Sequence, residues 1–248
     1  MKASFLRRRS MQALLPAVLL LSACSKKDDP VVTPAPETGR INAYHAAASA
    51  NVSVKVLVDD AEKATLTYGQ NSGYQTVNTG SRVVKVNVAS SGAAAFPSQS
   101  VSVEKDKSYS YFAYASTATA VTGLLVPDDL TVPTTGKAKI RLVHLGVDAP
   151  AALKLSTTAA SVADIANTGA SFGGFSPFVE IQPGQYNVAV TSGTSSATLV
   201  NVGDGSGSGA GTNKTYEAGK IYTIVVRGIN SQLVAPDLQT KAVLIQNN

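Results

Sequence analysis

The 248-residue sequence is poor in several residue types that mark particular protein classes. It has one cysteine, no tryptophan, two methionines and two histidines, and aromatic residues make up 6% of the chain. A single cysteine excludes a disulfide framework within the chain and a cysteine-rich zinc site. With only two histidines, a histidine-based metal site would need several acidic ligands as well. We therefore predict neither a metal nor another cofactor.

The longest apolar run lies near the N-terminus, at residues 11–21, and only Gln12 and Pro16 interrupt it. Four basic residues, Lys2, Arg7, Arg8 and Arg9, precede it. The run is too short to span a bilayer stably, so it predicts a signal peptide over residues 1–23 rather than a transmembrane helix.

The single cysteine follows this segment directly. Leu21-Ser22-Ala23-Cys24 resembles the bacterial lipobox, where cleavage before the cysteine accompanies attachment of a diacylglyceryl group to its sulfur. We predict cleavage between Ala23 and Cys24 and lipid attachment at Cys24; the alternative is an ordinary signal peptide followed by an incidental cysteine. Lipidation would consume a thiol that is a liability in an oxidising compartment, and two or three acyl chains anchor a protein stably. The membrane, reached through this lipid, is thus one predicted partner.

Processing would also change the charge. Four of the 21 basic residues and none of the 16 acidic residues lie in residues 1–23, so the net charge falls from +5 to about +1. The basic balance therefore belongs to the signal segment and does not indicate a nucleic-acid partner.

The residues after Cys24 carry information on destination. Lys27-Asp28-Asp29 resembles the lysine-plus-acids signal that sends Bacteroidota-type lipoproteins to the outer cell surface. The alternative is a solvated spacer in a lipoprotein that faces the periplasm. We expect an outer-membrane, lipid-anchored protein that faces the cell exterior. Residues 24–38 are rich in proline and acids, which predicts a disordered tether.

The rest of the chain contains an internal repeat. Three pairs of segments correspond: residues 40–56 with 139–155 at an offset of 99, 68–80 with 172–184 at 104, and 104–114 with 217–227 at 113. Because the offset only grows, we interpret this as a duplication whose second copy has longer loops. The predicted organisation is a first domain over residues 39–132, a linker over 133–138 and a second domain over 139–248.

Both copies have the alternation typical of strands. Val54, Val56 and Val58 alternate with Lys55 and Leu57, and similar runs recur every eight to twelve residues between glycine, proline, asparagine or aspartate. This pattern predicts an all-β protein made of antiparallel sandwiches.

Specific residues of the second copy resemble a known family, the bacterial domain of unknown function numbered 4397. They are His144, Asp148-Ala149-Pro150, Phe172-Gly173, Ser176, Phe178, Pro183-Gly184, Tyr186 and the run from Gly219 to Thr223. The first copy departs from the pattern, with Ser49, Asn51 and Asp106 in place of Asp148, Pro150 and Gly219. The resemblance implies two tandem immunoglobulin-like β-sandwich domains on a secreted or surface lipoprotein. It implies no catalytic residues.

Few side chains are candidates for a site. His45 and His144 occupy equivalent positions, and we expect structural histidines that are hydrogen-bonded where a strand ends; His144 with Asp148 is a weak binding candidate. In the run 108–114, we expect Tyr109 and Tyr111 to point into the core and Tyr114 to point outward, where it would contact a ligand. The acidic pairs 59–60 and 128–129 fall at predicted turns, where we expect them to be solvated.

These observations favour a lipid-anchored, non-enzymatic envelope protein that binds, adheres or acts as a spacer, with a glycan or protein as its extracellular ligand. One alternative is a carbohydrate- or polymer-binding accessory of an outer-membrane uptake system. Another is a hydrolase, which would need two acids that converge in a cleft.

Overall fold

The computed structural model describes residues 35–158, 162–192 and 197–248. These residues form β-strands and one short 3-10 helix, η1 (Ala48–Ala50), and this part of the chain contains no α-helix. Strand β2 (Val54–Val58) illustrates the alternation that favours strands: its three valines are buried, and the two residues between them are half-buried. The predicted all-β class is confirmed. No helix in the described ranges is long and apolar enough to cross a membrane.

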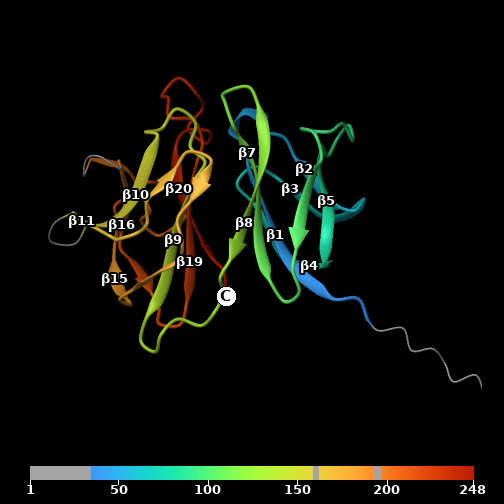
Figure 1. Ribbon diagram of the computed structural model, residues 1–248. Helices are drawn as coiled ribbons and strands as arrows, with labels where there is room; N and C mark the ends of the chain where they lie inside the picture. Colours follow the sequence, from blue (N-terminus) through green and yellow to red (C-terminus); the bar gives the residue numbers. More distant parts are fainter. Residues whose placement is uncertain (1–34, 159–161, 193–196) are drawn as a thin grey trace, which may run out of the picture. The chain divides into compact units, whose positions relative to one another are not determined.

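Residues 38–128, which we call the first half, form two four-stranded sheets (Figure 1). One has the order β4-β1-β7-β8 and the other the order β3-β2-β5-β6. Besides β2, their strands are β1 (Thr38–Ala46), β3 (Ala61–Leu66), β4 (Asn71–Asn78), β5 (Gly80–Val88), β6 (Gln99–Val103), β7 (Ser108–Ala115) and β8 (Val121–Asp128). Neighbours are antiparallel except for β1 and β7, which run parallel.

The two sheets of the first half share one hydrophobic core. Ile41 and Tyr111 reach it from the first sheet, and Val56, Val84 and Val103 reach it from the second. Alternation along each strand therefore places one face of each sheet in this core, as the period-two pattern predicts.

Residues 138–247, the second half, repeat this pairing plan with shorter and more numerous strands. One sheet has the order β13-β9-β19-β20, with β14 also paired to β9; another has the order β11-β10-β16-β17, with β12 paired to β10; β15 and β18 form a separate pair. The bounds are β9 (Ala138–His144), β10 (Ala152–Thr157), β11 (Ala163–Asp164), β12 (Ala170–Ser171), β13 (Gly174–Phe175), β14 (Val179–Ile181), β15 (Gly184–Tyr186), β16 (Val188–Ser192), β17 (Thr198–Asn201), β18 (Lys214–Tyr216), β19 (Ile221–Arg227) and β20 (Lys241–Gln246).

The correspondence between the halves extends to strand direction and core. The first strand of the second half, β9, runs parallel to β19, as β1 does to β7. A second hydrophobic core contains Ile140 and Ile224 from the β9–β19 sheet and Leu155 and Val190 from the β10–β16 sheet. Two sheets facing one core thus occur in each half.

A third hydrophobic cluster joins the two halves, and we call the surface it occupies the junction. Tyr44 and Phe112 of the first half pack there with Val143, Val225 and Ile245 of the second half. Strands β7, β9 and β19 are consequently buried at every position, because one face lies in their own core and the other in the junction. Residues 36–248 form one compact unit by their contacts; the predicted division into two domains stays a prediction.

Candidate functional site

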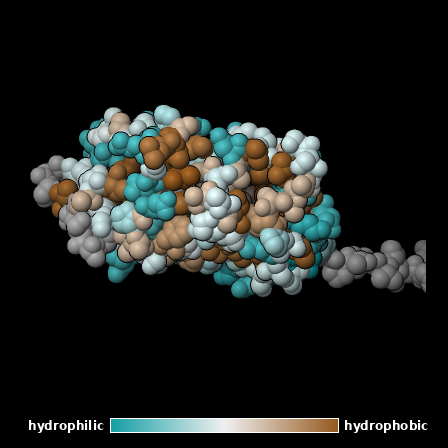
Figure 2. All heavy atoms as spheres, turned by 90° about the horizontal axis from the view of Figure 1, so that it is seen from above, coloured by the Kyte–Doolittle hydropathy of each residue, from teal (hydrophilic) through white to brown (hydrophobic). Residues whose placement is uncertain are grey.

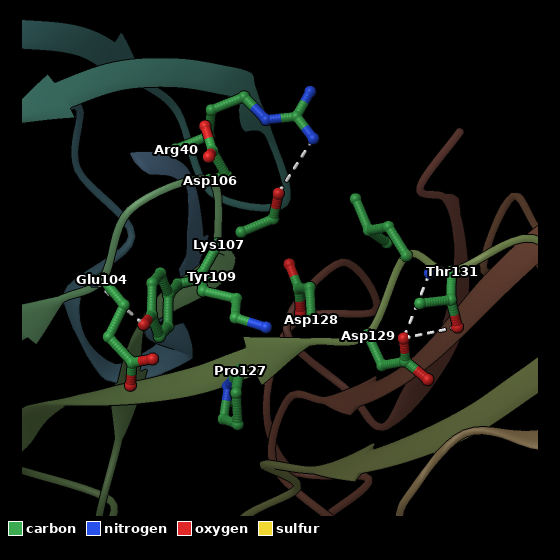
Figure 3. A pocket seen from close by; sticks show the side chains of 11 residues that line it. Arg40, Glu104, Asp106, Lys107, Tyr109, Pro127, Asp128, Asp129 and Thr131 are labelled. Carbon is green, nitrogen blue, oxygen red and sulfur yellow. Dashed lines mark hydrogen bonds between the residues drawn. The ribbon is translucent and has the colours of Figure 1, made fainter. Parts of the chain in front are cut away.

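An open cavity of about 580 Å³ lies where β7 begins and β8 ends. Its lining is dominated by polar and charged side chains, with Arg40, Asp106 and Lys107 from one part of the first half and Asp129 and Thr131 from the segment after β8 (Figure 3). This segment leads directly to β9, so the cavity is bounded by the chain that connects the two halves.

Several charges in the cavity are uncommitted. None of the ion pairs among the described residues involves Arg40, Glu104, Asp106 or Lys107. The Arg40 guanidinium donates one hydrogen bond to Ser108 Oγ at 3.0 Å and lies 5.3 Å from the centroid of the Tyr74 ring, and its other donors have no hydrogen-bond partner among the described residues. Both signs of charge are therefore available to a ligand within one cavity.

Asp129, by contrast, is held in place. Its carboxylate accepts hydrogen bonds from the hydroxyl and the backbone N–H of Thr131 at 2.7 and 3.1 Å and from Lys139 Nζ at 3.0 Å. The hydrogen bonds from the Thr131 hydroxyl and backbone, and then the hydrogen bond and charge of Lys139, outweigh desolvation and lower the pKa of Asp129 to about 2. This wall of the cavity stays anionic and ordered at neutral pH.

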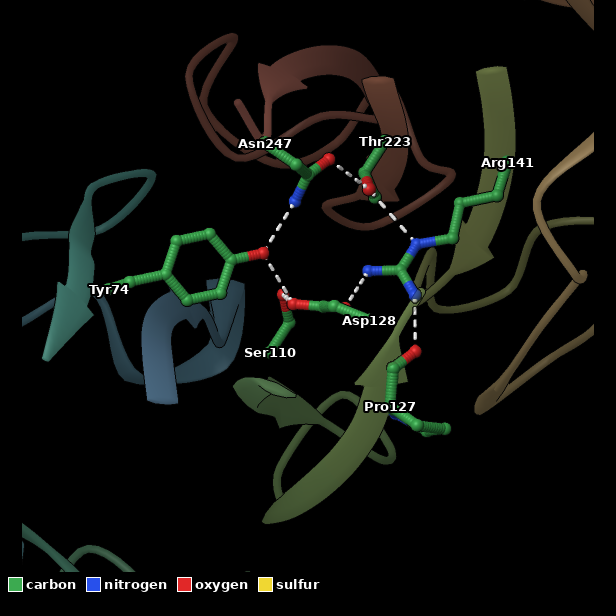
Figure 4. A network of polar contacts seen from close by, with 7 residues as sticks. All are labelled: Tyr74, Ser110, Pro127, Asp128, Arg141, Thr223 and Asn247. Atoms are coloured by element: carbon green, nitrogen blue, oxygen red, sulfur yellow. Dashed lines mark hydrogen bonds and ion pairs between the residues drawn. The ribbon is translucent and has the colours of Figure 1, made fainter. Parts of the chain in front are cut away.

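Behind the cavity, a buried polar network crosses the junction, and we call it the Arg141 network (Figure 4). All three guanidinium nitrogens of Arg141 donate: Nη2 to Asp128 Oδ1, Nη1 to the Pro127 carbonyl at 2.9 Å and Nε to Thr223 Oγ1 at 3.0 Å. The side chains of Arg141 and Asp128 are 1% and 0% exposed. The Phe178 ring also lies 4.3 Å from the guanidinium carbon.

The second oxygen of Asp128 is satisfied as well. Tyr74 and Ser110 donate their hydroxyls to Oδ2 at 2.6 and 2.8 Å. Asn247 completes the network, since its amide donates to the Tyr74 oxygen at 3.0 Å and its carbonyl oxygen accepts from Thr223 at 2.8 Å. Burial and then the Asp128 charge raise the pKa of Tyr74 far above its ordinary value, so the phenol remains a donor.

This network ties the cavity to the junction. Asp128 lines the cavity and is also the acid partner of Arg141. A buried ion pair in which each nitrogen and each oxygen has a hydrogen-bond partner favours one arrangement of its surroundings, because any other arrangement leaves a charge unpaired. The cavity wall at residues 127–129 is therefore held in one position by the second half.

Sequence patterns do not reveal this network. The expectation that Asp128 is solvated at a turn is wrong, because the residue ends β8 on the face that the second half covers. Arg141 was not singled out, although an arginine in the otherwise apolar stretch from Ile140 to Val143 is the signal that would have found it.

The two histidines have the predicted structural role. His45 Nε2 donates to the Val52 carbonyl and His144 Nε2 to the Pro150 carbonyl, both at 2.9 Å. In each ring Nδ1 lies 3.4 Å from the backbone N–H two residues later, so the neutral tautomer is specified. His144 is fully buried and Asp148 is exposed with a φ of +58°. The His144 ring therefore has no free nitrogen for a ligand.

Tyr114 does not point into solvent, and that expectation is wrong. It is 9% exposed, because its strand face lies in the junction. Its ring packs edge-on against Phe172 of the second half at 6.2 Å, and Phe172 packs in turn against His144 at 5.6 Å. Tyr109 and Tyr111 are buried in the first core, as predicted. Aromatic exposure is found instead at Phe172 and Phe175, which are 37% and 39% exposed.

Apart from these two rings, the surface shown in Figure 2 carries its apolar residues in separate groups. On the face seen from above, groups of brown apolar residues are separated by white and teal ones (Figure 2). No group of three histidine, cysteine or acidic side chains in the described ranges is placed to hold a metal ion. Asp59 and Asp60 form a hairpin turn with positive φ and pair with Arg82 and Lys85.

The matched family coincides with the part of the chain that holds the cavity. Residues 39–152 match the domain of unknown function DUF4397. The DUF4397 match runs from β1 into the first residue of β10, so it includes every residue that lines the cavity and both Asp128 and Arg141. The match does not extend over residues 153–248, which contain most of the residues that carry the resemblance to this family. No curated protein matches the chain.

Several predicted residues lie outside the described ranges. They are the cleavage site between Ala23 and Cys24, the lipid-attachment residue Cys24, and the export signal Lys27-Asp28-Asp29.

Proposed function

We propose that this chain is a lipid-anchored, non-enzymatic binding module of a bacterial cell envelope, and that the cavity beside Arg40 and Lys107 holds its ligand. The observation that supports this most directly is the polar cavity of about 580 Å³ with uncommitted charges of both signs. A cavity of this size suits a small molecule or the end of a polymer. A pure spacer would need no such cavity.

The proposed architecture is a duplication of one immunoglobulin-like β-sandwich domain. The equivalent hydrogen bonds of His45 and His144, seven and six residues before their carbonyl partners, support it. So does the parallel pairing of the first strand with the next-to-last strand in each half. In this proposal the junction makes two domains act as one body, and the tether over residues 24–38 connects that body to the lipid on Cys24.

The anchor is tested by replacing its attachment point. Cys24→Ser is expected to abolish labelling by a radioactive fatty acid and to release the protein from the membrane fraction, because the remaining N-terminal segment would supply no acyl chain. The matched control is Ser22→Ala, which keeps the cysteine. If Cys24→Ser stayed in the membrane fraction after its signal segment had been cleaved away, the lipid anchor would be contradicted.

Orientation is tested separately with intact cells. A protease that cannot cross the outer membrane should degrade residues 39–248 rapidly while a periplasmic control protein stays uncut. Replacing Lys27, Asp28 and Asp29 by alanine should then protect the protein until the cells are lysed. Protection of the unaltered chain would place the module in the periplasm and leave the anchor proposal intact.

The cavity is tested with small charged probes. Because it offers both cations and acids, we expect a zwitterionic dipeptide or a uronic acid to shift amide NMR signals of residues 104–109 and 127–131. Arg40→Gln should weaken that binding about tenfold, the usual effect of one charge-assisted hydrogen bond. Lys55→Gln, whose ion pair with Glu62 is exposed on the other sheet, is the control. Unchanged binding in Arg40→Gln would exclude the cavity as the site.

The carbohydrate-binding alternative rests on a different observation, the exposed rings of Phe172 and Phe175. Sugars stack on such rings. Retention of the protein on an immobilised polysaccharide, lost in Phe172→Ala and Phe175→Ala but kept in Arg40→Gln, would favour this alternative.

A further inference from the structure

A second buried arginine crosses the junction at Arg227, the last residue of β19. It is 9% exposed, and its guanidinium carbon lies 4.2 Å from the centroid of the Tyr68 ring in the first half. Gly69, with a φ of +88°, lets the chain approach closely, since a Cβ there would lie 2.7 Å from Arg227 Nη2. Tyr44, Tyr68, Gly69 and Arg227 form what we call the Arg227 cluster.

Four polar atoms of this cluster are buried without a hydrogen-bond partner in the described ranges. Arg227 Nε and Nη1 and the hydroxyls of Tyr44 and Tyr68 are closed off from solvent and have no hydrogen-bond partner among the described residues. None of the acidic side chains in the described ranges forms an ion pair with Arg227. A buried guanidinium without a counter-charge is costly, and the adjacent ring offsets only part of that cost.

The two hydroxyls lie within electrostatic reach of the arginine. Burial raises the pKa of both Tyr44 and Tyr68, and the Arg227 charge opposes that rise in each case. Both phenols therefore stay protonated at neutral pH and cannot supply the missing negative charge. Each hydroxyl can donate its proton to a ligand, and its oxygen can also accept from the guanidinium.

The duplicated half provides an internal comparison. Each residue of the cluster has a counterpart in the other copy. The counterpart of Tyr44 is Val143, that of Tyr68 is Phe172, and that of Arg227 is Tyr114. The second set contains no charge, and Tyr114 packs on the Phe172 ring as Arg227 packs on the Tyr68 ring. Each of Tyr44, Tyr68 and Arg227 is thus more polar than its counterpart, and the charge of Arg227 occurs together with the two neighbouring hydroxyls.

We propose that Tyr44, Tyr68 and Arg227 bind one small monovalent anion of the halide type, with chloride as the natural ligand. Two guanidinium nitrogens and two hydroxyls without a hydrogen-bond partner in the described ranges suit a spherical anion, and one negative charge balances one guanidinium. The ion would be fully dehydrated, which disfavours the larger and more strongly hydrated phosphate and sulfate. Because the ligands come from both halves, the anion would also stabilise the junction. This site is separate from the cavity beside Arg40.

Thermal unfolding of the purified full chain tests the proposal in solution. Replacing sodium gluconate by sodium bromide or chloride at constant ionic strength should raise Tm by about 3 °C in a saturable manner, since an ion that binds only the folded chain stabilises it. Tyr68→Phe and Arg227→Met should lose most of this increase. Tyr114→Phe, at the equivalent position of the other copy, should retain it.

Crystals soaked in bromide give the structural readout. An anomalous peak in contact with Arg227 and the two hydroxyls, absent in Tyr68→Phe, is expected. A peak without any halide effect on Tm would indicate an adventitious ion only and would overturn the proposal. So would equal halide responses of the unaltered chain and Tyr68→Phe, which keeps its ring and is expected to fold even if Arg227→Met does not.

Discussion

Two buried arginines cross the junction between the halves, and their surroundings differ. Arg141 has a carboxylate, a carbonyl and a hydroxyl as partners for its three nitrogens. Arg227 has an aromatic ring at 4.2 Å, nearly the same as the 4.3 Å between Arg141 and Phe178, but no acceptor for Nε or Nη1 in the described ranges. Burial and ring contact are thus alike, and the counter-charge is what distinguishes the two sites.

The two sites differ in how many charges the corresponding positions of the halves supply. At the offset of 99, Arg141 stands in the second half where Asn42 stands in the first, and the Arg141 network carries a charge from each half. The Arg227 cluster carries a charge from the second half only. A complete pair favours a single rigid arrangement, whereas Arg227 has no counter-charge among the described residues, which is the basis of the proposed anion site.

The largest expected effect comes from breaking the complete pair. Arg141→Met leaves the Asp128 carboxylate buried without its partner and should lower the free energy of unfolding by about 3–5 kcal/mol, measured by urea denaturation. Arg82→Met, which breaks an exposed pair with Asp59, should cost less than about 1 kcal/mol. If Arg141→Met costs no more than Arg82→Met, the network does not hold the junction.

A double variant sharpens the same comparison. Replacing both partners, Arg141→Met with Asp128→Leu, removes both buried charges and should recover much of the stability lost in Arg141→Met alone. A loss equal to the sum of the two single variants would mean that the two side chains do not interact in the folded chain.

The next effect concerns the hydroxyl that links the network to the C-terminus. Tyr74→Phe removes the donor to Asp128 and the acceptor for Asn247 while it keeps the ring. We expect the free energy of unfolding to fall by about 1–3 kcal/mol, because a buried charge loses one hydrogen bond and a buried amide loses another. Tyr109→Phe, whose hydroxyl accepts only one backbone N–H, is the matched control and should cost less.

Two equivalent glycines allow a direct comparison of the arginine and tyrosine positions. Gly69 and Gly173 have φ values of +88° and +72°, so alanine at either should cost about 1–2 kcal/mol. An added Cβ would meet Arg227 Nη2 at 2.7 Å in one case and the Tyr114 hydroxyl at 2.9 Å in the other. Since displacing a buried cation is harder, Gly69→Ala should be the less stable variant in thermal unfolding. The reverse order would contradict the packing described for Arg227.

The smallest effect is the pH dependence that the two histidines contribute. Burial lowers the pKa of both below the ordinary value of 6.5, so each binds a proton more readily in the unfolded chain. Stability should therefore fall as the pH drops below about 6.5, and rise again when the pH is restored. His45→Gln with His144→Gln should flatten this slope in urea denaturation between pH 7 and 5. An unchanged slope would assign the dependence to other groups.

Local patterns predicted much of what the structure contains. Alternating valines in β2 and β5, and the inward Tyr109 and Tyr111, follow from the period of a strand, which depends only on backbone geometry. The buried, hydrogen-bonded histidines follow from their equivalent places in two similar segments. These features need no knowledge of what lies beyond a sheet.

The cavity and the two arginine sites could not be predicted in this way. Alternation says which residues share a face, but not whether that face meets water or another sheet. Tyr114 and Asp128 were expected in solvent, since nothing in residues 108–129 shows that the second half covers them. The match to DUF4397 covers residues 39–152 and does not include Arg227.

The sequence by itself determined the all-β class and the local setting of His45 and His144, because each depends on residues close together in the chain. Only the tertiary structure decided which outer faces are buried against each other, which arginine finds a carboxylate and where a polar cavity remains open. Those outcomes depend on contacts between residues such as Tyr74 and Asn247, which lie in different halves and meet only when the junction forms.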